Sequence, residues 1–222
     1  MKQYYEAYDD RYRQVHRQKL QWASDIPSPI VRQIIGRYHL HPDGKILEIG
    51  CGEGRDAVHL LRSGHNVTAT DISPEAIRYC RERWPEFSGH FSVLDCLNER
   101  CTDKFDYIYA VAVVHMLVED NHRAAFYRFL REHLTTQGVA LVCTMGDGTT
   151  EHSSDPSTAF VLQNRIHAQS GQQLQLAATS CRMVTREAFL CEIRRSGLHI
   201  LEHGLTEVPP DFPTMMYAVI TK

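Results

Sequence analysis

The stretch Ile46–Leu61, ILEIGCGEGRDAVHLL, decides the predicted fold of this chain. An apolar run is followed by glycines at positions 50, 52 and 54, and a helical pattern then begins at once. A strand that enters a helix through a glycine turn leaves unpaired backbone N–H groups and the positive end of the helix beside a ligand. A glycine motif alone is also compatible with any tight turn of an α/β sheet. The stretch therefore raises the hypothesis of a cradle for a nucleotide-like ligand.

Strand-length apolar runs and helical patterns alternate on the C-terminal side of this stretch, up to residue 145. Strands are predicted at residues 45–49, 66–71, 91–95, 105–112 and 139–145. Helices are predicted at residues 55–63 and 73–84, and around Phe126, Phe129, Leu130 and Leu134 with Gly138 as the stop. Such alternation is typical of successive βαβ units with helices on both faces of a parallel sheet. The fold class is therefore α/β, a doubly wound Rossmann-like sheet.

The C-terminal part predicts a helix over residues 186–196, stopped by Gly197, and then two strands at 198–205 and 214–222. The eight residues between these strands, TEVPPDFP, are too few for a crossover helix, so the pair is predicted to be antiparallel. The sheet would then be mostly parallel and seven-stranded, with an antiparallel C-terminal hairpin.

Length and composition favour one domain. The 222 residues are 43% hydrophobic and 23% charged, which suits a single domain over residues 1–222. Within it we expect an N-terminal helical cover (1–40), a ligand-binding core (41–145), a substrate-cover insertion (146–182) and a C-terminal helix with a strand pair (183–222). The insertion begins as a loop and becomes faintly helical in pattern.

Charge and the absence of targeting signals limit the expected partners and location of the protein. A net charge of −3 argues against sequence-independent binding of nucleic acid, which needs clustered Lys and Arg. The polar N-terminus lacks the apolar core of a signal peptide, and no run is long enough to span a membrane. Seven cysteines without paired spacing suggest reduced thiols. We therefore expect a cytoplasmic protein, a monomer or a homodimer, that binds neither nucleic acid nor membrane.

Two acidic residues identify the ligand expected at the cradle. Asp71 ends the second strand, 21 residues after Gly50, where a carboxylate can accept both hydroxyls of a ribose. Asp95 ends the third strand and is followed by Cys96, where a carboxylate and an N–H can contact an adenine edge. In the dinucleotide fingerprint G-x-G-x-x-G, the third glycine position is occupied here by Arg55. The pattern therefore favours an adenosine over a pyrophosphate.

At these residues the sequence resembles the class I S-adenosylmethionine-dependent methyltransferases. The segments ILEIGCGEGRDAVHLL, VTATDIS, VLDCL and KFDYIYAVAVVHML are most similar to the small-molecule branch that includes the tellurite-resistance and thiopurine methyltransferases. The resemblance is strong over about residues 45–145. It implies S-adenosyl-L-methionine as cofactor and S-adenosyl-L-homocysteine as product. The cofactor-binding residues that it implies are Glu48, Gly50, Cys51, Gly52 and Gly54 at the methionine part, Asp71 at the ribose, Ile72, Asp95 and Cys96 at the adenine, and Ala110 and Val111 under the sulfonium.

Methyl transfer from a sulfonium needs no catalytic acid, because the leaving group departs neutral. Positioning alone can contribute roughly 7 to 11 kcal/mol. A base helps only when the acceptor loses a proton, as a hydroxyl or thiol does. His115, just past the fourth strand, is the first candidate base, with a buried histidine at a helix start as the alternative. The next candidate bases are Asp147 and His152, which come after the fifth strand, although Asp147 also suits a turn.

Acceptor contacts are assigned to the two covers. The candidates are Tyr4, Tyr8, Trp22 and Arg165, although tyrosines at helical spacing also fit one packed face. No histidine spacing matches a zinc pattern, so no metal is expected. The predicted acceptor is a small molecule that reacts through oxygen, nitrogen or sulfur, because the N/D-P-P-Y/W element of amide methylation is missing. The alternatives are a nicotinamide-dependent oxidoreductase and a protein that binds the cofactor without turnover.

Overall fold

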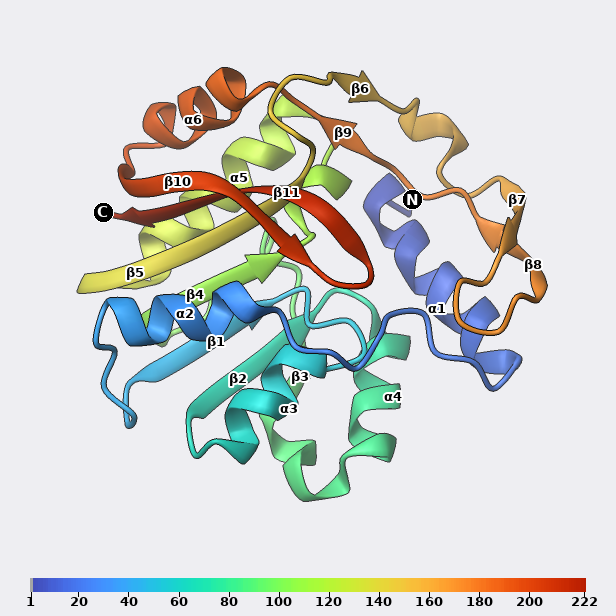
Figure 1. Cartoon of the computed structure of the whole chain (residues 1–222), viewed down its shortest axis with the longest axis horizontal. Coiled ribbons are helices and arrows are strands. Elements are labelled where there is room, and N and C mark those ends of the chain that lie inside the picture. The colour runs from blue at the N-terminus through green and yellow to red at the C-terminus, as the bar shows by residue number, and fades with distance from the viewer. Residues whose placement is uncertain (1) are drawn as a thin grey trace.

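A seven-stranded sheet forms the centre of the structure, a computed structural model that describes residues 2–222 (Figure 1). Its strands are β1 (Lys45–Ile49), β2 (Asn66–Asp71), β3 (Phe91–Val93), β4 (Phe105–Val111), β5 (Leu134–Met145), β10 (His199–Val208) and β11 (Phe212–Thr221). The spatial order is β10-β11-β5-β4-β1-β2-β3. β1 to β5 pair in parallel, and β11 is antiparallel to both β5 and β10. The predicted fold class and the antiparallel C-terminal pair are confirmed.

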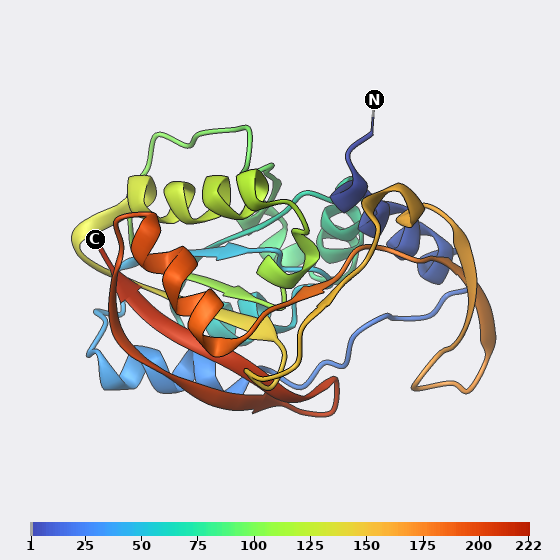
Figure 2. The same ribbon diagram turned by 90° about the horizontal axis from the view of Figure 1, so that it is seen from above.

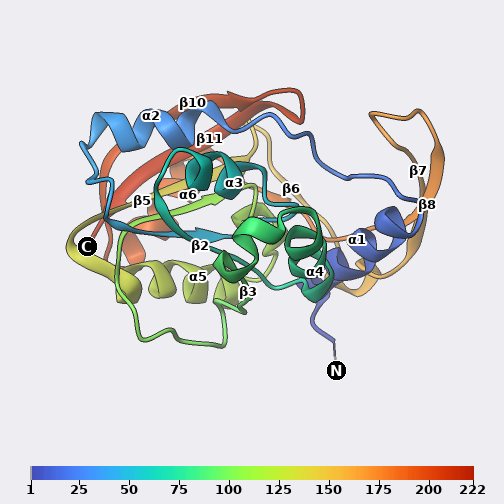
Figure 3. The ribbon, with the colours of Figure 1, turned by 90° about the horizontal axis from the view of Figure 1, so that it is seen from below.

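Helices cover both faces of this sheet. They are α2 (Pro29–Arg37), α3 (Arg55–Arg62), α4 (Pro74–Arg83), α5 (Asp120–His133) and α6 (Arg186–Arg195). Seen edge-on, α2 lies on one side of the sheet and α5 on the other (Figures 2 and 3). Neighbouring residues of a strand face opposite sides of the sheet, so each strand contributes to the core on both sides. Ile46 packs in the cluster with α2 and α3, and Leu47 packs in the cluster with α5 and α6.

Local sequence explains where these helices begin. Ser73 caps α4 by accepting a hydrogen bond from the Ala76 N–H at 3.0 Å, and Pro74 occupies the first helical position. Thr185 caps α6 in the same way, accepting from the Ala188 N–H. Short 3-10 turns connect other elements, namely η1 (Tyr4–Glu6), η2 (Pro85–His90), η3 (Val114–Met116) and η4 (Pro156–Thr158).

The boundary between α5 and β5 differs from the prediction. α5 ends at His133, and Leu134 already begins β5 opposite Phe105 of β4. Gly138 lies inside β5, where a Cβ would stand 2.9 Å from the carbonyl oxygen of Phe105. The prediction that Gly138 stops the helix is therefore wrong, because glycine here permits two strands to approach closely.

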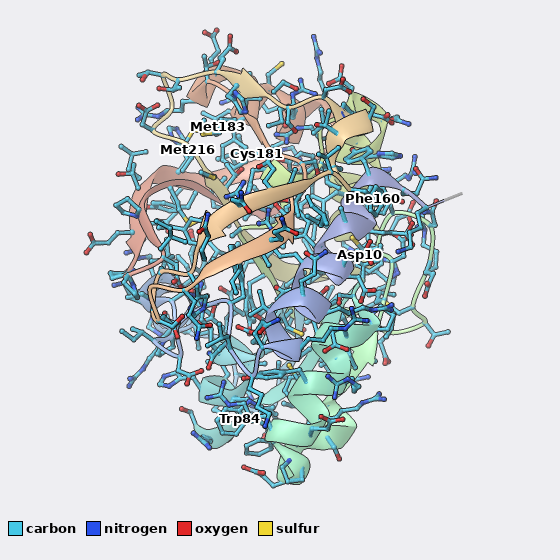
Figure 4. The ribbon with its side chains drawn as sticks, turned by 90° about the vertical axis from the view of Figure 1, so that its right-hand side faces the viewer. Asp10, Trp84, Phe160, Cys181, Met183 and Met216 are labelled. Carbon is cyan, nitrogen blue, oxygen red and sulfur yellow. The ribbon has the colours of Figure 1, made fainter. Side chains whose placement is uncertain are left out.

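Two segments outside the doubly wound core lie side by side at its carboxyl edge. They contain α1 (Ala7–Arg17) and four short strands, β6 (His152–Ser153), β7 (Leu162–Ile166), β8 (Gln173–Ala177) and β9 (Arg182–Met183). The β7–β8 hairpin runs beside α1 (Figure 4), and Arg11 donates to the carbonyl oxygens of Ala177 and Ala178 at 2.9 and 2.6 Å. This hairpin lies where a faintly helical pattern was predicted in 146–182, so that prediction is wrong here. β7 is exposed along its length and therefore carries no burial periodicity that could have indicated its structure.

Two further observations concern the chain as a whole. Within residues 2–222, no helix is both long enough and apolar enough to cross a membrane. All seven cysteines lie among the described residues and are free thiols.

Candidate functional site

The glycine turn after β1 lies at the carboxyl edge of the sheet, the edge toward which β4 points in Figure 1. Gly50 has φ +73°, and a Cβ there would stand 2.4 Å from Val113 Cγ2. Gly52 has φ +53°, and a Cβ there would stand 2.7 Å from Tyr12 Oη. Both positions therefore need glycine, for conformation and for space. Gly54 shapes the same turn but faces Cys80 and Phe91 rather than the site.

An inner cavity of about 80 Å³ lies beside this turn. Its lining residues come from α1, the turn, and the segments after β2, β3 and β4: Tyr5, Tyr8, Tyr12, Ile49, Gly50, Asp71, Ile72, Leu94, Asp95, Cys96, Leu97, Val113, Met116 and Leu117. The structure thus brings together the residues predicted for a ribose and an adenine. It also places three tyrosines of the N-terminal cover against them.

The two predicted carboxylates in the inner cavity are held by backbone N–H groups. Asp71 accepts from Gly52 and Ser73, each at 2.8 Å. Burial raises the pKa of Asp71 to about 6, despite these hydrogen bonds. Asp95 accepts from the N–H of Leu97 at 2.9 Å and from the amide of Asn98 at 2.7 Å. Both carboxylates are therefore fixed in orientation before any ligand is bound.

An outer cavity of about 440 Å³ lies on the other side of Tyr12. Its lining residues are Tyr12, Trp22, Ala23, Glu48, Gly50, Cys51, Gly52, Glu53, Arg55, Asp56, Val111, Ala112, Met116, Ile166, His167, Ala168, Gln169, Pro210, Asp211 and Phe212. Tyr12, Gly50 and Met116 line both cavities. The two cavities therefore meet at the glycine turn, and the outer one extends to the β7–β8 loop and the β10–β11 hairpin.

Glu48 is the buried acid of the outer cavity. It is 4% exposed, and its Oε2 has no hydrogen-bond partner among the described residues. Burial, together with the neighbouring charge of Asp56, raises the pKa of Glu48 well above its usual value. A buried acceptor without a partner is rare in proteins, so this atom is suited to a ligand.

Arg55 joins the turn to two covering segments. Its guanidinium donates to Asp211 at 2.6 Å and to Ser28 Oγ at 3.3 Å, and it lies 3.6 Å from Asp56. Asp56 in turn accepts from both the N–H and the hydroxyl of Ser28, at 2.6 and 2.7 Å. The loop between β10 and β11 and the link before α2 are therefore both tied to the start of α3.

Glu53 and His16 lock the N-terminal cover onto the turn. Glu53 accepts from the N–H groups of Trp22 and Ala23 at 2.7 and 2.8 Å. The buried His16 ring contacts Glu53 Oε1 at 2.9 Å and Glu75 Oε1 at 2.8 Å. Burial lowers the pKa of His16, but the hydrogen bonds and charges of Glu53 and Glu75 outweigh it and raise the pKa above its ordinary value.

A substitution of His16 tests this lock. We expect His16→Gln to lower the free energy of unfolding by about 2 kcal/mol at pH 6, because a charge-assisted pair of hydrogen bonds is lost. A raised pKa means that the contribution is complete below the unfolded-state pKa and disappears as pH rises through the folded-state value. The difference from wild type, measured by urea denaturation, should therefore shrink from pH 6 to pH 9. The exposed His203→Gln is the control, and a difference that grows with pH would contradict the lock.

His16, Glu53 and Asp211 were not predicted as site residues. Glu53 lies inside the glycine turn, so the motif itself contained a signal. Its partners lie 30 and more residues away in sequence, and only the folded chain brings them together.

His115 is buried at η3 and does not line either cavity. Its Nδ1 has no partner among the described residues, and its ring lies 6.3 Å from that of Phe212, centroid to centroid. Burial and the charge of Arg123 lower the pKa of His115 to about 4. The structure therefore argues against a base here and agrees with the alternative of a buried histidine at a helix start.

Asp147 and His152 are not brought to the cavities. Asp147 is exposed and accepts from the N–H groups of Thr149 and Thr150, each at 2.8 Å. These hydrogen bonds hold the pKa of Asp147 well below its usual range. His152 lies exposed in β6, opposite Met183 of β9. The turn alternative for Asp147 fits the structure, and neither residue is positioned to act on a bound acceptor.

The four residues predicted to contact the acceptor lie in different places, and only two of them line a cavity. Tyr8 lines the inner cavity and Trp22 the outer cavity. The hydroxyl of Tyr4 instead accepts from the N–H groups of Val118 and Glu119, which fixes η1 on the core. Arg165 lies in the exposed β7 and lines neither cavity.

The end of β4 places one of its two predicted residues at the site. Val111 lines the outer cavity, with Ala112 after it. Ala110 points to the opposite side and packs in the cluster under α5. Strand alternation explains this difference, because neighbouring residues face opposite sides of the sheet.

Comparisons with known proteins agree with this arrangement. Residues 46–138 match the family model described as Methyltransferase domain. A magnesium-protoporphyrin O-methyltransferase of Rhodobacter capsulatus is 35% identical over 69 residues, which are 30% of this chain and 31% of that protein. A probable S-adenosyl-L-methionine-dependent methyltransferase, TehB of Haemophilus influenzae, is 25% identical over 100 residues, 44% of this chain and 35% of that protein.

Other relatives differ in the acceptor that their names state. An mRNA cap guanine-N(7) methyltransferase of Cryptococcus neoformans is 33% identical over 76 residues, 32% of this chain and 12% of that protein. The aligned parts thus span about a third or less of these relatives. Among solved structures, the CcbJ methyltransferase from Streptomyces caelestis has a TM-score of 0.70 at 16% identity and covers 98% of each chain. At this identity the likeness shows the fold.

The residues at the site fit the cofactor of this family. The inner cavity carries the two fixed carboxylates, the glycine turn leaves backbone open to close approach, and Glu48 offers a buried acceptor without a partner. Residues 46–138 thus match a methyltransferase domain, and the chain shares its fold with solved S-adenosylmethionine-dependent methyltransferases, whose cofactor is S-adenosylmethionine.

Proposed function

We propose that this protein transfers a methyl group from S-adenosylmethionine to a small-molecule acceptor bound in the outer cavity. The observation that carries the proposal is the meeting of the two cavities at the glycine turn. The inner cavity of about 80 Å³, which lies among the residues proposed for the adenine and the ribose, opens there into a second, larger space of about 440 Å³. The outer cavity also extends beyond the residues assigned to the cofactor, to Trp22, Ile166 and Phe212, where the acceptor would bind.

Each part of the site has a role in this proposal. Asp71 would hold the ribose, and Ile72, Asp95 and Cys96 would contact the adenine. Gly50, Cys51, Gly52 and Glu48 would hold the methionine part, with Val111 under it. When bound, the cofactor supplies a methyl group on a positively charged sulfur, ready for in-line displacement by a nucleophile.

The covers would exclude water and position the acceptor. Tyr12 stands between the two cavities, and the Glu53–His16 contacts hold its helix in place. Trp22, Phe212 and the β7–β8 loop would enclose the acceptor. Because positioning can contribute most of the acceleration in such a displacement, the proposal needs no catalytic dyad.

The acceptor is proposed as a small molecule because the outer cavity is bounded by the covers. The magnesium-protoporphyrin O-methyltransferase supports this class, whereas the mRNA cap relative would favour RNA. A net charge of −3 supports a small-molecule acceptor over RNA. We further propose that the protein is cytoplasmic and acts as a monomer or homodimer.

Ligand binding tests the proposal against its two alternatives. We expect S-adenosylhomocysteine at a hundredfold excess over its Kd to raise the melting temperature by about 5 to 10 °C, and NADH to leave it unchanged. Stabilisation by NADH alone would favour the oxidoreductase. If S-adenosylhomocysteine binds but none is released from S-adenosylmethionine across a panel of thiols, amines, phenols and carboxylates, the protein is a non-catalytic binder.

A further inference from the structure

The outer cavity is rich in carboxyl groups. Glu48, Glu53, Asp56 and Asp211 line it, and Arg55 is the one Lys or Arg side chain among its lining residues. Even without Glu48, which the methionine part of the cofactor would engage, three acidic side chains line the cavity beside one guanidinium. Counting His16, which contacts Glu53 from behind the lining, as a second basic side chain still leaves the acidic side chains in excess. This field repels an anionic acceptor and attracts a cationic one.

No lining cation is free to receive an anion. Arg55 already donates to Asp211 at 2.6 Å and lies 3.6 Å from Asp56. Both nitrogens of His167 are also engaged, with the carbonyl oxygen of Gln21 at 2.6 Å and with Ser170 Oγ at 2.8 Å. A carboxylate, phosphate or oxyanion acceptor would therefore lose its water shell without gaining a free cationic partner.

The lining acids are not free to act as a base, because Glu48 would be engaged by the methionine part of the cofactor and the other three are already paired. Glu53 and Asp56 accept the backbone and side-chain hydrogen bonds already described, and Asp211 is paired with Arg55 and with the hydroxyl of Ser24 at 3.0 Å. An alcohol or phenol needs its proton removed as it attacks, whereas a neutral amine does not. The cavity therefore serves an acceptor that is nucleophilic without help from a base.

Apolar side chains form part of the remaining wall. Trp22, Met116 and Phe212 line the cavity, and Ile166 at the end of β7 lines it while 76% exposed. An exposed apolar side chain at the rim gains stabilisation when an apolar body covers it. The acceptor should thus combine a polar reacting group with an apolar body.

From the paired carboxyl groups, the single engaged guanidinium and the apolar rim, we propose that the acceptor is an amine on an apolar body and is methylated at nitrogen. This inference rests on the proposed function and specifies its substrate class. The amine arrives as an ammonium ion and loses a proton to solvent. Its neutral nitrogen then forms a bond to the methyl carbon as the carbon–sulfur bond breaks, and that electron pair remains on sulfur.

Three probes that share one apolar body test the inference by binding. 2-Phenylethylamine, 2-phenylethanol and phenylacetate are titrated into the full chain saturated with S-adenosylhomocysteine, with calorimetry as the readout. We expect the amine to bind at least about tenfold more tightly than the alcohol or the acid, because the carboxylates favour the ammonium ion. Equal affinities, including undetectable binding of all three, or a reversed order would overturn the inference.

A change of charge at the rim provides a second readout. Gln169 lines the outer cavity and donates to the carbonyl oxygen of Ala23 at 3.1 Å. Gln169→Lys should weaken amine binding and strengthen phenylacetate binding, each about threefold or more, whereas Gln169→Glu should do the opposite. Gln172→Lys, outside the cavity, is the matched control. An unchanged order of probes in Gln169→Lys would place the amine elsewhere and overturn the inference.

The same samples separate the two proposals. Saturation with S-adenosylhomocysteine is measured before any probe is added. If that ligand does not bind, the proposed function fails. If it binds and the acid or alcohol is preferred, or its O-methyl product is the one found by mass spectrometry with S-adenosylmethionine, only the amine inference fails.

Discussion

Replacing Gly50 with alanine is expected to lower the free energy of unfolding by about 2 to 5 kcal/mol and to abolish S-adenosylhomocysteine binding. Gly50 has φ +73°, where a residue with a Cβ costs about 1 to 2 kcal/mol. The added Cβ would also stand 2.4 Å from Val113 Cγ2, and such overlap costs about 1 to 3 kcal/mol more. Relief by moving Val113 would displace the wall of the inner cavity. Urea denaturation and calorimetric titration measure the two effects.

Two other glycines separate backbone strain from overlap. Gly64 has φ +85° and nothing within 4 Å of a Cβ, so Gly64→Ala should show only the backbone cost and bind ligand normally. Gly36 lies in α2 with open space around it, so Gly36→Ala should stabilise by about 0.5 to 1 kcal/mol. If Gly50→Ala were no more destabilising than Gly64→Ala, overlap with Val113 would be refuted as a cause.

Replacing Asp71 with asparagine is expected to weaken S-adenosylhomocysteine binding by about 10- to 100-fold, the range for losing hydrogen bonds to a charged group. Both carboxylate oxygens are already held by backbone N–H groups, and a ribose would share them. An amide keeps the shape but offers one acceptor oxygen instead of two. One N–H, of Gly52 or Ser73, would therefore also lose its acceptor.

The pH dependence of binding gives a second signature of Asp71. Its pKa of about 6 means that the carboxylate is protonated below that value, so wild-type affinity should fall as pH decreases from 7 to 5. The variant should lose most of this dependence. In the free protein the raised pKa acts oppositely, because the folded state binds more protons between about pH 4 and 6 and loses stability as pH rises through that window.

An exposed acid serves as the control for both experiments. Asp155 lies outside the cavities and caps η4 by accepting from the N–H of Ser157. Asp155→Asn should bind S-adenosylhomocysteine as wild type does. Equal affinity of Asp71→Asn and wild type at pH 7.5 would remove Asp71 from the ribose site.

Local patterns predicted the elements whose signals are complete within a few residues. β1 and β2 have the predicted bounds, and α4 begins at the predicted cap and proline. β3 is shorter than predicted, and α5 ends before the glycine that was expected to stop it. Glycine has two uses, ending a helix or allowing two strands to meet, and only the neighbouring strand decides between them.

Some site residues could likewise be assigned from the sequence, whereas others could not. Gly50, Asp71 and Asp95 could be assigned because each belongs to a motif that ends its own strand, and parallel strands bring those ends to one edge. His115 follows the same rule, yet its ring turned out to lie in the core. Whether a side chain at the end of a strand faces a cavity depends on the packing around it, and His115 is only 4% exposed, with its ring beside that of Phe212.

The sequence by itself determined the cradle, the cofactor that the cradle resembles and the order of strands and helices around it, because these depend on contacts between near neighbours. The tertiary structure decided what surrounds the acceptor. The Glu53–His16 lock joins segments that are 37 residues apart, and the Arg55–Asp211 pair joins segments that are 156 residues apart. The apolar rim combines Trp22, Ile166 and Phe212 from three separate segments. No local pattern predicts such contacts, because the sequence around each partner is also typical of an ordinary exposed polar or apolar residue.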